Sequence, residues 1–442
     1  MWTAFHIGLG IITTLSRWPF IIWFFFWFSI TIVTALRSNT QSFIGKFVAL
    51  TAYLVSFELL ARMCKTAPFI PYETSKYLLI LFCGFGLFFT QNKLYRPGLA
   101  MVALICPAFL YDLSGLSGFS GLVFNGFAPL GLAIGAAYLG NVKLDLITLN
   151  SILRLIWYTA LASFSFVFFK TPDFDTINFG LGANFETTGG ESSNQVSSVL
   201  GLGMVLSFYS WFFRLNFSGH RIGDLIFTAL FGFQGLLTFS RGGIFVGVLA
   251  IALIYFLSNL NKQSDGKKKI KIPFYYLIII AVLGLITFQQ VDKITGGKLV
   301  LRYQGETEGT LIGHKEKNLN VLSTNRFAIL MGDLELWQEN LIGGVGVGAS
   351  KYLRTNDRSN PHVEFSRLLA EHGIPGLLYF GIMIYLGFRA YKQKTVPQIK
   401  TILIALYLIG LLTSFHSATR TYITPLLIAL STITPINLRN KK

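Results

Sequence analysis

Long apolar runs with almost no charge recur along this 442-residue chain. Residues 18–36, for example, read WPFIIWFFFWFSITIVTAL and carry no charged side chain. A run of about 20 apolar residues is long enough to cross the hydrocarbon core of a bilayer as an α-helix. Open sheets and irregular segments cannot do so, because their backbone groups would stay unpaired in lipid. The sequence therefore predicts an all-α polytopic membrane protein.

Hydropathy predicts about 12 to 14 transmembrane helices, depending on whether residues 1–16 also span. The other segments that we expect to span are residues 18–36, 47–60, 77–90, 98–111, 122–139, 152–169, 196–213, 225–238, 244–257, 275–288, 376–388, 401–413 and 421–436. One large polar segment, residues 289–375, interrupts this series.

The loop charges predict an orientation. Residues 262–271 (KQSDGKKKIK), 389–400 and 439–442 are basic, whereas loop 170–195 carries four acidic residues and only one basic one. Because basic loops stay in the cytoplasm, loop 170–195 and the polar segment are expected on the external side. The chain then divides into a transmembrane bundle (1–288, including loop 170–195), a large external loop with helices (289–375) and C-terminal transmembrane helices (376–442).

The net charge of +17 could indicate a nucleic-acid partner, but the sequence contains no RNA- or DNA-binding motif. We attribute the charge to cytoplasmic loops and to arginines that face an anionic, phosphate-bearing substrate. The three cysteines, Cys64, Cys83 and Cys106, lie in or beside apolar runs without metal-site spacing. They are expected to be small buried side chains.

The polar segment predicts two helices. Residues 319–340 have helical spacing, which puts Arg326 and Asp333 on one face. Asn360 and Pro361 predict a second helix start, with His362 in its first turn. There the positive end of the helix dipole would lower the pKa of the imidazole and favour the neutral form that a general base needs.

Glycines lie between these two predicted helices. Residues 343–348 read GGVGVG, and four glycines in six residues permit unusual dihedral angles and a close backbone approach to a ligand. The spacing is not that of a dinucleotide-binding fingerprint, and no strand–helix–strand pattern surrounds it.

Five motifs taken together resemble the O-antigen ligase and polymerase superfamily, which are membrane glycosyltransferases of the C type (GT-C). They are SRGG after an apolar run (240–243), Arg302-Tyr303, a helix with Arg326 and Trp337, GVGVG (344–348) and PHVEFSRLLAEHGIPGLL (361–378). The resemblance covers about residues 235–380, and the N-terminal half matches only in hydropathy.

The resemblance implies transfer of a glycan from undecaprenyl diphosphate at the periplasmic face of a bacterial inner membrane. The acceptor would be a sugar hydroxyl, on lipid A–core in a ligase or on another repeat unit in a polymerase. No metal or other cofactor is implied. By position, Arg241, Arg302 and Arg326 match the family's diphosphate-binding arginines, and His362 matches the histidine that acts on the acceptor. Family members commonly have Asn after this histidine, where this chain has Val363; the following Glu364 is kept.

Physical chemistry supports the same assignment. Without a metal, a diphosphate leaving group needs fixed cations, and arginine stays charged and binds phosphate oxygens with two N–H groups. His362, Arg326 and Arg241 are therefore the predicted catalytic residues, and single displacement would invert the anomeric centre. The predicted substrate-binding residues are Arg302, Glu364, Arg367, Arg354 and Arg358. The last two could also bind phospholipid headgroups, and His416 and Arg420 could line the same cavity.

Simpler roles for the arginines stay open. Arg241 could be a helix-end arginine that reaches the interface, Arg326 could form a salt bridge with Asp333, and Arg302 could be an ordinary membrane-flanking charge. Of the functions, ligase is the first choice and polymerase the second. A polysaccharide or lipid transporter is a further alternative, but it would concentrate polar groups near the bilayer midplane, often with repeats that this chain lacks.

Overall fold

The computed structural model describes residues 1–37, 40–90, 93–113, 115–116, 118–260, 274–355 and 358–436. The basic runs 262–271 and 439–442 lie outside the described residues, so the orientation that rests on them stays a prediction.

The N-terminal half is helical almost throughout. Its elements are α1 (Trp2–Leu15), α2 (Trp18–Leu36), α3 (Gln41–Ser56), α4 (Glu58–Met63), α5 (Thr74–Phe89), α6 (Arg96–Ile105), the 3-10 helix η1 (Cys106–Leu110), α7 (Gly118–Leu139), the short strand β1 (Lys143–Leu144) and α8 (Leu146–Lys170). Two 3-10 turns follow, η2 (Phe174–Thr176) and η3 (Glu186–Thr188), and then α9 (Ser193–Phe213), α10 (Arg221–Leu237), α11 (Arg241–Leu260) and α12 (Tyr275–Ile294).

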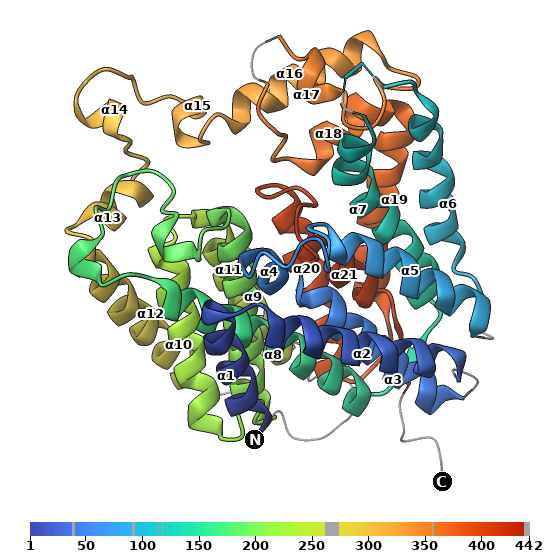
Figure 1. Cartoon of the computed structure of the whole chain (residues 1–442), viewed down its shortest axis with the longest axis horizontal. Coiled ribbons are helices and arrows are strands. Elements are labelled where there is room, and N and C mark those ends of the chain that lie inside the picture. Colours follow the sequence, from blue (N-terminus) through green and yellow to red (C-terminus); the bar gives the residue numbers. More distant parts are fainter. Residues whose placement is uncertain are drawn as a thin grey trace.

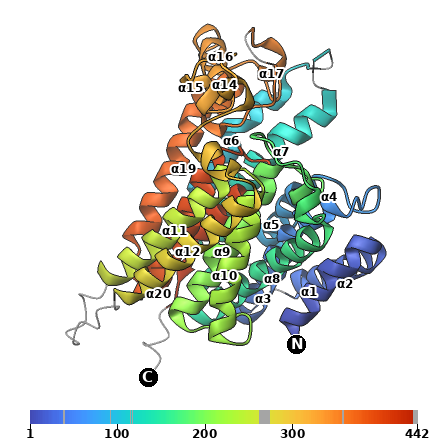
Figure 2. The same ribbon diagram turned by 90° about the vertical axis from the view of Figure 1, so that its left-hand side faces the viewer.

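The polar segment contains only shorter helices. They are α13 (Lys298–Tyr303), α14 (Glu308–Leu311), α15 (Leu319–Leu322), α16 (Arg326–Glu339), α17 (Ser350–Leu353) and α18 (Glu364–His372). The chain ends with α19 (Ile374–Lys392), α20 (Pro397–Ser414), α21 (Ile423–Ser431) and strand β2 (Thr434–Pro435). In both ribbon views α14 to α17 lie together at one end of the bundle, and the N-terminus lies at the other (Figures 1 and 2).

In the described part of the chain, nine helices are long and apolar enough to cross a membrane, and three shorter apolar helices accompany them: Trp2–Leu15, Thr74–Phe89 and Arg96–Leu110. The prediction of an all-α polytopic membrane protein is confirmed. The predicted span at 421–436 is much shorter than expected, because α21 has nine residues. At 1.5 Å per residue it reaches roughly 14 Å, about half the hydrocarbon core.

Helix α9 lies at the centre of the part that carries the site. It packs against α8, α10 and α11, and 94% of its most apolar window is buried. Small residues let α9 and α11 touch through their backbones: a Cβ on Gly201 would lie 2.3 Å from the carbonyl oxygen of Gly243. Such small-residue contacts bring membrane helices together. The hydroxyl of Ser197 donates to the carbonyl of Ser240 at 2.9 Å, so the start of α11 is fixed against α9.

The helix predicted over 319–340 is interrupted. Thr324 and Asn325 have left-handed backbones, with φ of 57° and 66°, and they separate α15 from α16. The break brings Arg326 to the N-terminus of α16, beside the end of α9. Helix α16 packs on α18, which in turn packs on α19.

Candidate functional site

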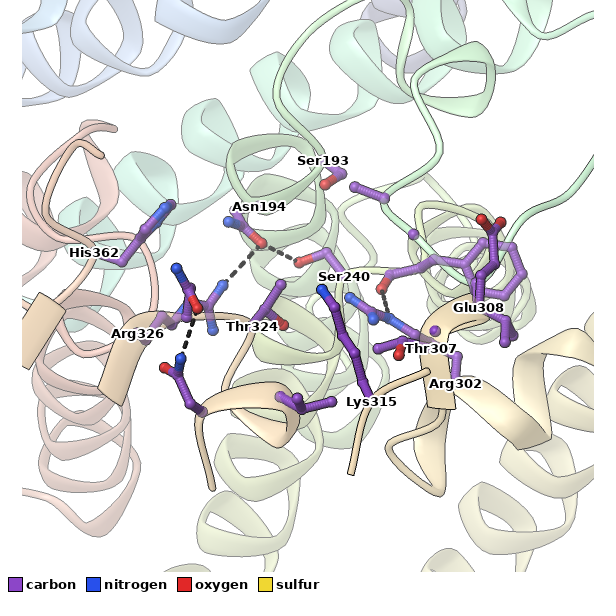
Figure 3. Close-up of a pocket in the computed structure, with 18 residues that line it drawn as sticks. Ser193, Asn194, Ser240, Arg302, Thr307, Glu308, Lys315, Thr324, Arg326 and His362 are labelled. Carbon is purple, nitrogen blue, oxygen red and sulfur yellow. Dashed lines mark hydrogen bonds between the residues drawn. The ribbon is translucent and has the colours of Figure 1, made fainter. Parts of the chain in front are cut away.

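A cavity of about 590 Å³ opens between the polar segment and the ends of α9 and α11. Its lining comes from four parts of the chain that lie far apart in sequence: Leu181, Gly182, Ala183, Ser193, Asn194, Phe239, Ser240, Arg302, Thr307, Glu308, Gly309, Lys315, Asn320, Val321, Thr324, Asn325, Arg326 and His362. Of the eight predicted site residues, Arg302, Arg326 and His362 line it. In Figure 3, His362 and Arg302 lie toward opposite ends of the lining, with Arg326 between them.

Arg326 is oriented by α9 and not by its own helix. Its Nη2 donates to Oδ1 of Asn194 at 3.3 Å, and the same oxygen accepts from the Ser240 hydroxyl at 2.8 Å (Figure 3). The salt bridge to Asp333 considered above is not formed. Asp333 lies 3.3 Å from Arg354 and accepts from Ser366 at 2.8 Å.

Arg241 and Arg302 bind backbone carbonyls. Arg241, at the start of α11, donates to the carbonyls of Arg302 at 3.3 Å and Leu322 at 2.7 Å. Arg302 donates to the carbonyl of Phe239 at 3.4 Å. Arg241 does not line the cavity. Its side chain binds two of the segments that do line the cavity.

The three arginines form no salt bridge among the described residues. Burial, followed by the charges of Arg241 and Arg326, lowers the pKa of Arg302 to about 10. Burial and Arg241 likewise lower the pKa of Arg326. Uncompensated, partly desolvated guanidinium groups beside a cavity favour an anionic ligand.

His362 lies at one end of the cavity lining, nearer to Arg326 than to Arg302 (Figure 3), and it precedes α18. Its carbonyl accepts from the Ala418 amide at 3.0 Å, and the Pro361 carbonyl accepts from Arg420 at 2.6 Å. Because both carbonyls bind the loop between α20 and α21, the backbone here does not turn into a helix, and α18 starts only at Glu364. The prediction that His362 occupies a first helical turn is wrong.

The imidazole of His362 is nevertheless neutral. Burial lowers its pKa to about 3, with further lowering by the charges of Arg420 and Arg326. The cause is thus desolvation and neighbouring arginines, where the sequence suggested a helix dipole. A neutral imidazole at a cavity wall can accept a proton from a bound hydroxyl.

The other predicted substrate-binding residues lie apart from the cavity lining. Arg367 is buried, forms an ion pair with Glu364, lies 3.1 Å from Glu371, and donates to the Asn125 carbonyl at 2.7 Å. Arg354 is buried against Asp333. Arg358 is exposed. The substrate-binding roles of these four residues remain predictions. Glu364, Arg367 and Arg354 are buried and form ion pairs inside the polar segment.

The glycine-rich loop approaches α18. The amides of Val345 and Gly346 donate to the carbonyls of Ala370 and Glu371 at 2.9 and 3.0 Å. Gly344 has φ of 68°, and a Cβ there would lie 2.5 Å from the backbone of Glu371. Amides of this loop therefore satisfy the last carbonyls of α18, and the glycine backbone makes its close approach to this helix.

Sequence reasoning missed several lining residues: Ser193, Asn194, Thr307, Glu308, Lys315 and Asn320. The polar triplet Ser192-Ser193-Asn194, directly before the apolar run of α9, was the one available signal. In the part of the chain that the structure describes, no three His, Cys, Asp or Glu side chains come together in a way that could hold a metal ion.

A second, apolar cavity of about 460 Å³ lies between α9, α10, α11 and α12. Its lining includes Phe245, Leu277, Leu283, Phe288 and Tyr303. Because Tyr303 follows Arg302 in the chain, the apolar cavity and the polar one have adjacent residues in their linings.

A family model described as O-antigen ligase matches residues 226–381, from within α10 to within α19. The matched region contains Arg241, Arg302, Arg326 and His362, whereas Asn194 lies outside it. No curated protein sequence matches the chain. The resemblance to the O-antigen ligase and polymerase superfamily is therefore confirmed over residues 226–381, the part of this membrane protein that the family model matches.

Proposed function

We propose that this protein is a membrane glycosyltransferase of the O-antigen ligase type. It transfers a glycan from undecaprenyl diphosphate to a sugar hydroxyl of lipid A–core, at the periplasmic face of a bacterial inner membrane. The observation that carries the proposal is a polar cavity lined by Arg302, Arg326 and a neutral His362, with Arg241 beside it. Among the described residues, none of the three arginines has a carboxylate partner.

The arginines suit a departing diphosphate. When the bond between the anomeric carbon and the phosphate oxygen breaks, negative charge builds up on the diphosphate. Arg302 and Arg326 line the cavity where that charge would lie, and Arg241 is close enough to lower the pKa of both. Cations that are already in place need no reorganisation during the reaction, which is where most electrostatic catalysis originates.

The apolar cavity suits the isoprenoid chain of the donor. It lies between apolar helices, and its lining reaches Tyr303, next to Arg302. A polyprenyl tail between these helices would put its diphosphate beside the arginines. Apolar cavities with a few convergent polar groups at one end are typical of sites for amphipathic ligands.

His362 would activate the acceptor. Its imidazole accepts the proton of the sugar hydroxyl as the oxygen attacks the anomeric carbon, and the diphosphate leaves from the other side toward the arginines. The separation of His362 from Arg302 across the cavity supports this in-line arrangement (Figure 3). One displacement inverts the anomeric configuration, and the step as written routes no charge through a metal ion.

The lowered pKa of His362 predicts that kcat/KM, which reports the free enzyme, does not fall as the pH is lowered from 8 to 5. With a pKa of about 3, the imidazole stays neutral from pH 8 down to pH 5, so kcat/KM should change little over this range. An ordinary imidazole with a pKa near 6.5 would lose roughly 30-fold of its neutral form by pH 5. The measurement is kcat/KM against pH in detergent or nanodiscs. A fall centred near pH 6.5 would contradict the assignment.

A polymerase of the same superfamily is the second candidate, because the family match covers both. Deleting the gene in its host and separating the envelope polysaccharides on a gel distinguishes the two. We expect loss of polymer attached to lipid A–core, with intact lipid-linked polymer left behind. Single repeat units on an otherwise normal core would indicate a polymerase, and unchanged polysaccharides would contradict both.

A further inference from the structure

Arg62, in α4, is the centre of a buried polar cluster outside the family-matched region. Its side chain is 4% exposed and donates to five acceptors from four parts of the chain. These are Glu58 Oε1 at 2.5 Å, Glu73 Oε2 at 3.4 Å, the Tyr72 carbonyl at 2.9 Å, Gln195 Oε1 at 2.5 Å and the Arg420 carbonyl at 3.0 Å. Only the planar guanidinium, with its five fixed donors, can satisfy such a set.

One branch of this cluster leads to His362. Arg62 binds the carbonyl of Arg420, whose own guanidinium donates to the Pro361 carbonyl at 2.6 Å. The Ala418 amide in the same loop donates to the His362 carbonyl at 3.0 Å. Glu58 secures the loop from the other side, because its second oxygen accepts from the Tyr422 amide at 2.7 Å.

The other branch leads to the arginines. Arg62 binds the side chain of Gln195, which directly follows Asn194 at the start of α9. Asn194 in turn accepts from Arg326 at 3.3 Å and from Ser240, the residue before Arg241. The buried side chain of Arg62 thus connects the start of α9, which binds Arg326, with the loop between α20 and α21, which binds the backbone beside His362.

Stability alone gives little reason for this arrangement. Burying an arginine and two carboxylates costs much of what their attraction returns, and well-packed apolar residues often stabilise a fold equally well. What a guanidinium with fixed acceptors adds is a defined geometry between the segments that it joins.

We propose that Arg62 is a positioning residue for the transfer reaction, which fixes His362 relative to Arg326 through Arg420 and Gln195. It touches no substrate. The expected effect on the transfer rate rests on the proposed function. The anchoring of the start of α9 and of the loop between α20 and α21 rests on the structure alone.

The kinetic test compares Arg62→Lys with Arg389→Lys. Lysine keeps the charge of Arg62 but cannot bind Gln195 and the Arg420 carbonyl together. Arg389 is a matched control, because it also binds backbone carbonyls, those of Thr432 and Gly140. It lies about 22 Å along α19 from the end of that helix that adjoins the polar segment, so it is far from the cavity. We expect kcat to fall about 100-fold in Arg62→Lys, with a smaller change in KM, because misplacement by about 1 Å has this effect. Arg389→Lys should stay within about threefold of wild type.

A second measurement does not depend on turnover. Hydrogen exchange at the Ala418 amide, which binds the His362 carbonyl, should become faster in Arg62→Lys and stay unchanged in Arg389→Lys. Equal exchange and equal kcat in the two variants would overturn the proposal. If wild-type protein showed no transfer at all, the proposed function would fail, while exchange at Ala418 would still decide whether Arg62 anchors the loop.

A milder variant covers the case in which Arg62→Lys does not fold. Arg420→Lys shortens the reach to Pro361 and leaves the carbonyl of residue 420 in place. It should reproduce most of the loss in kcat. Where both single variants fold, the two losses should not multiply in the double variant, because residues that act through one path are not additive. Multiplicative losses would overturn the route through Arg420.

Discussion

His362→Ala is expected to lower the rate of glycan transfer by about 100- to 10,000-fold, which is the usual contribution of a general base. The substitution leaves the arginines in place, so binding of the lipid-linked donor should change little. The Ala418 amide donates to the backbone carbonyl of residue 362, and alanine keeps this hydrogen bond. The loss should therefore appear in kcat. Turnover of a purified polyprenyl-diphosphate glycan in nanodiscs measures it.

His314→Ala is the matched control. His314 belongs to the same polar segment, but it is exposed and does not line the cavity. Its removal should leave turnover within about twofold of wild type. If His362→Ala kept wild-type turnover at normal expression, the base assignment would fall, whatever the arginines do.

Arg326→Ala is expected to have the second-largest effect, a fall in kcat of about 100- to 1,000-fold, as for the loss of one preorganised donor to a developing charge. Arg326→Lys should recover part of this loss only. Lysine keeps the charge but loses the two-pronged contact with phosphate oxygens and the geometry that Asn194 orients. Single-turnover kinetics with saturating donor separates this effect from donor binding.

Arg358→Ala provides the control for charge in the same segment. This arginine is exposed and lies outside the cavity lining, so its loss should reduce turnover less than about threefold. The comparison also tests the sequence-based prediction that Arg358 binds substrate. Equal losses in Arg358→Ala and Arg326→Ala would support substrate binding by Arg358 and would mean that the cavity alone does not hold the donor.

Much of this architecture could be predicted because membrane helices are encoded locally. A window of apolar residues shows a span without knowledge of its neighbours, and short motifs singled out Arg302, Arg326 and His362 before any geometry was known. The arginines come from different helices, yet motif order alone was enough to group them.

What the sequence could not show depends on contacts between distant segments. Asn194 orients Arg326 across 132 positions. The polar triplet that contains Asn194 marks a helix start, but it does not show that this side chain meets Arg326. The start of α18 was misplaced because Asn360-Pro361 is a good local helix start, but Arg420 and the Ala418 amide bind the carbonyls that the first turn would have used. Tertiary hydrogen bonds overrode the local preference there.

The backbone contact between α9 and α11 has a consequence for the range of glycans that can be accommodated. A Cβ on Gly243 would lie 2.3 Å from the main chain of Ser197, so these helices cannot move closer, and the shared hydrogen bonds oppose their separation. The distance between α9 and α11 is therefore fixed on this side of the cavity. If the protein transfers glycans as proposed, larger sugars would have to be accommodated on the side of α14 and α15, neither of which has a buried residue.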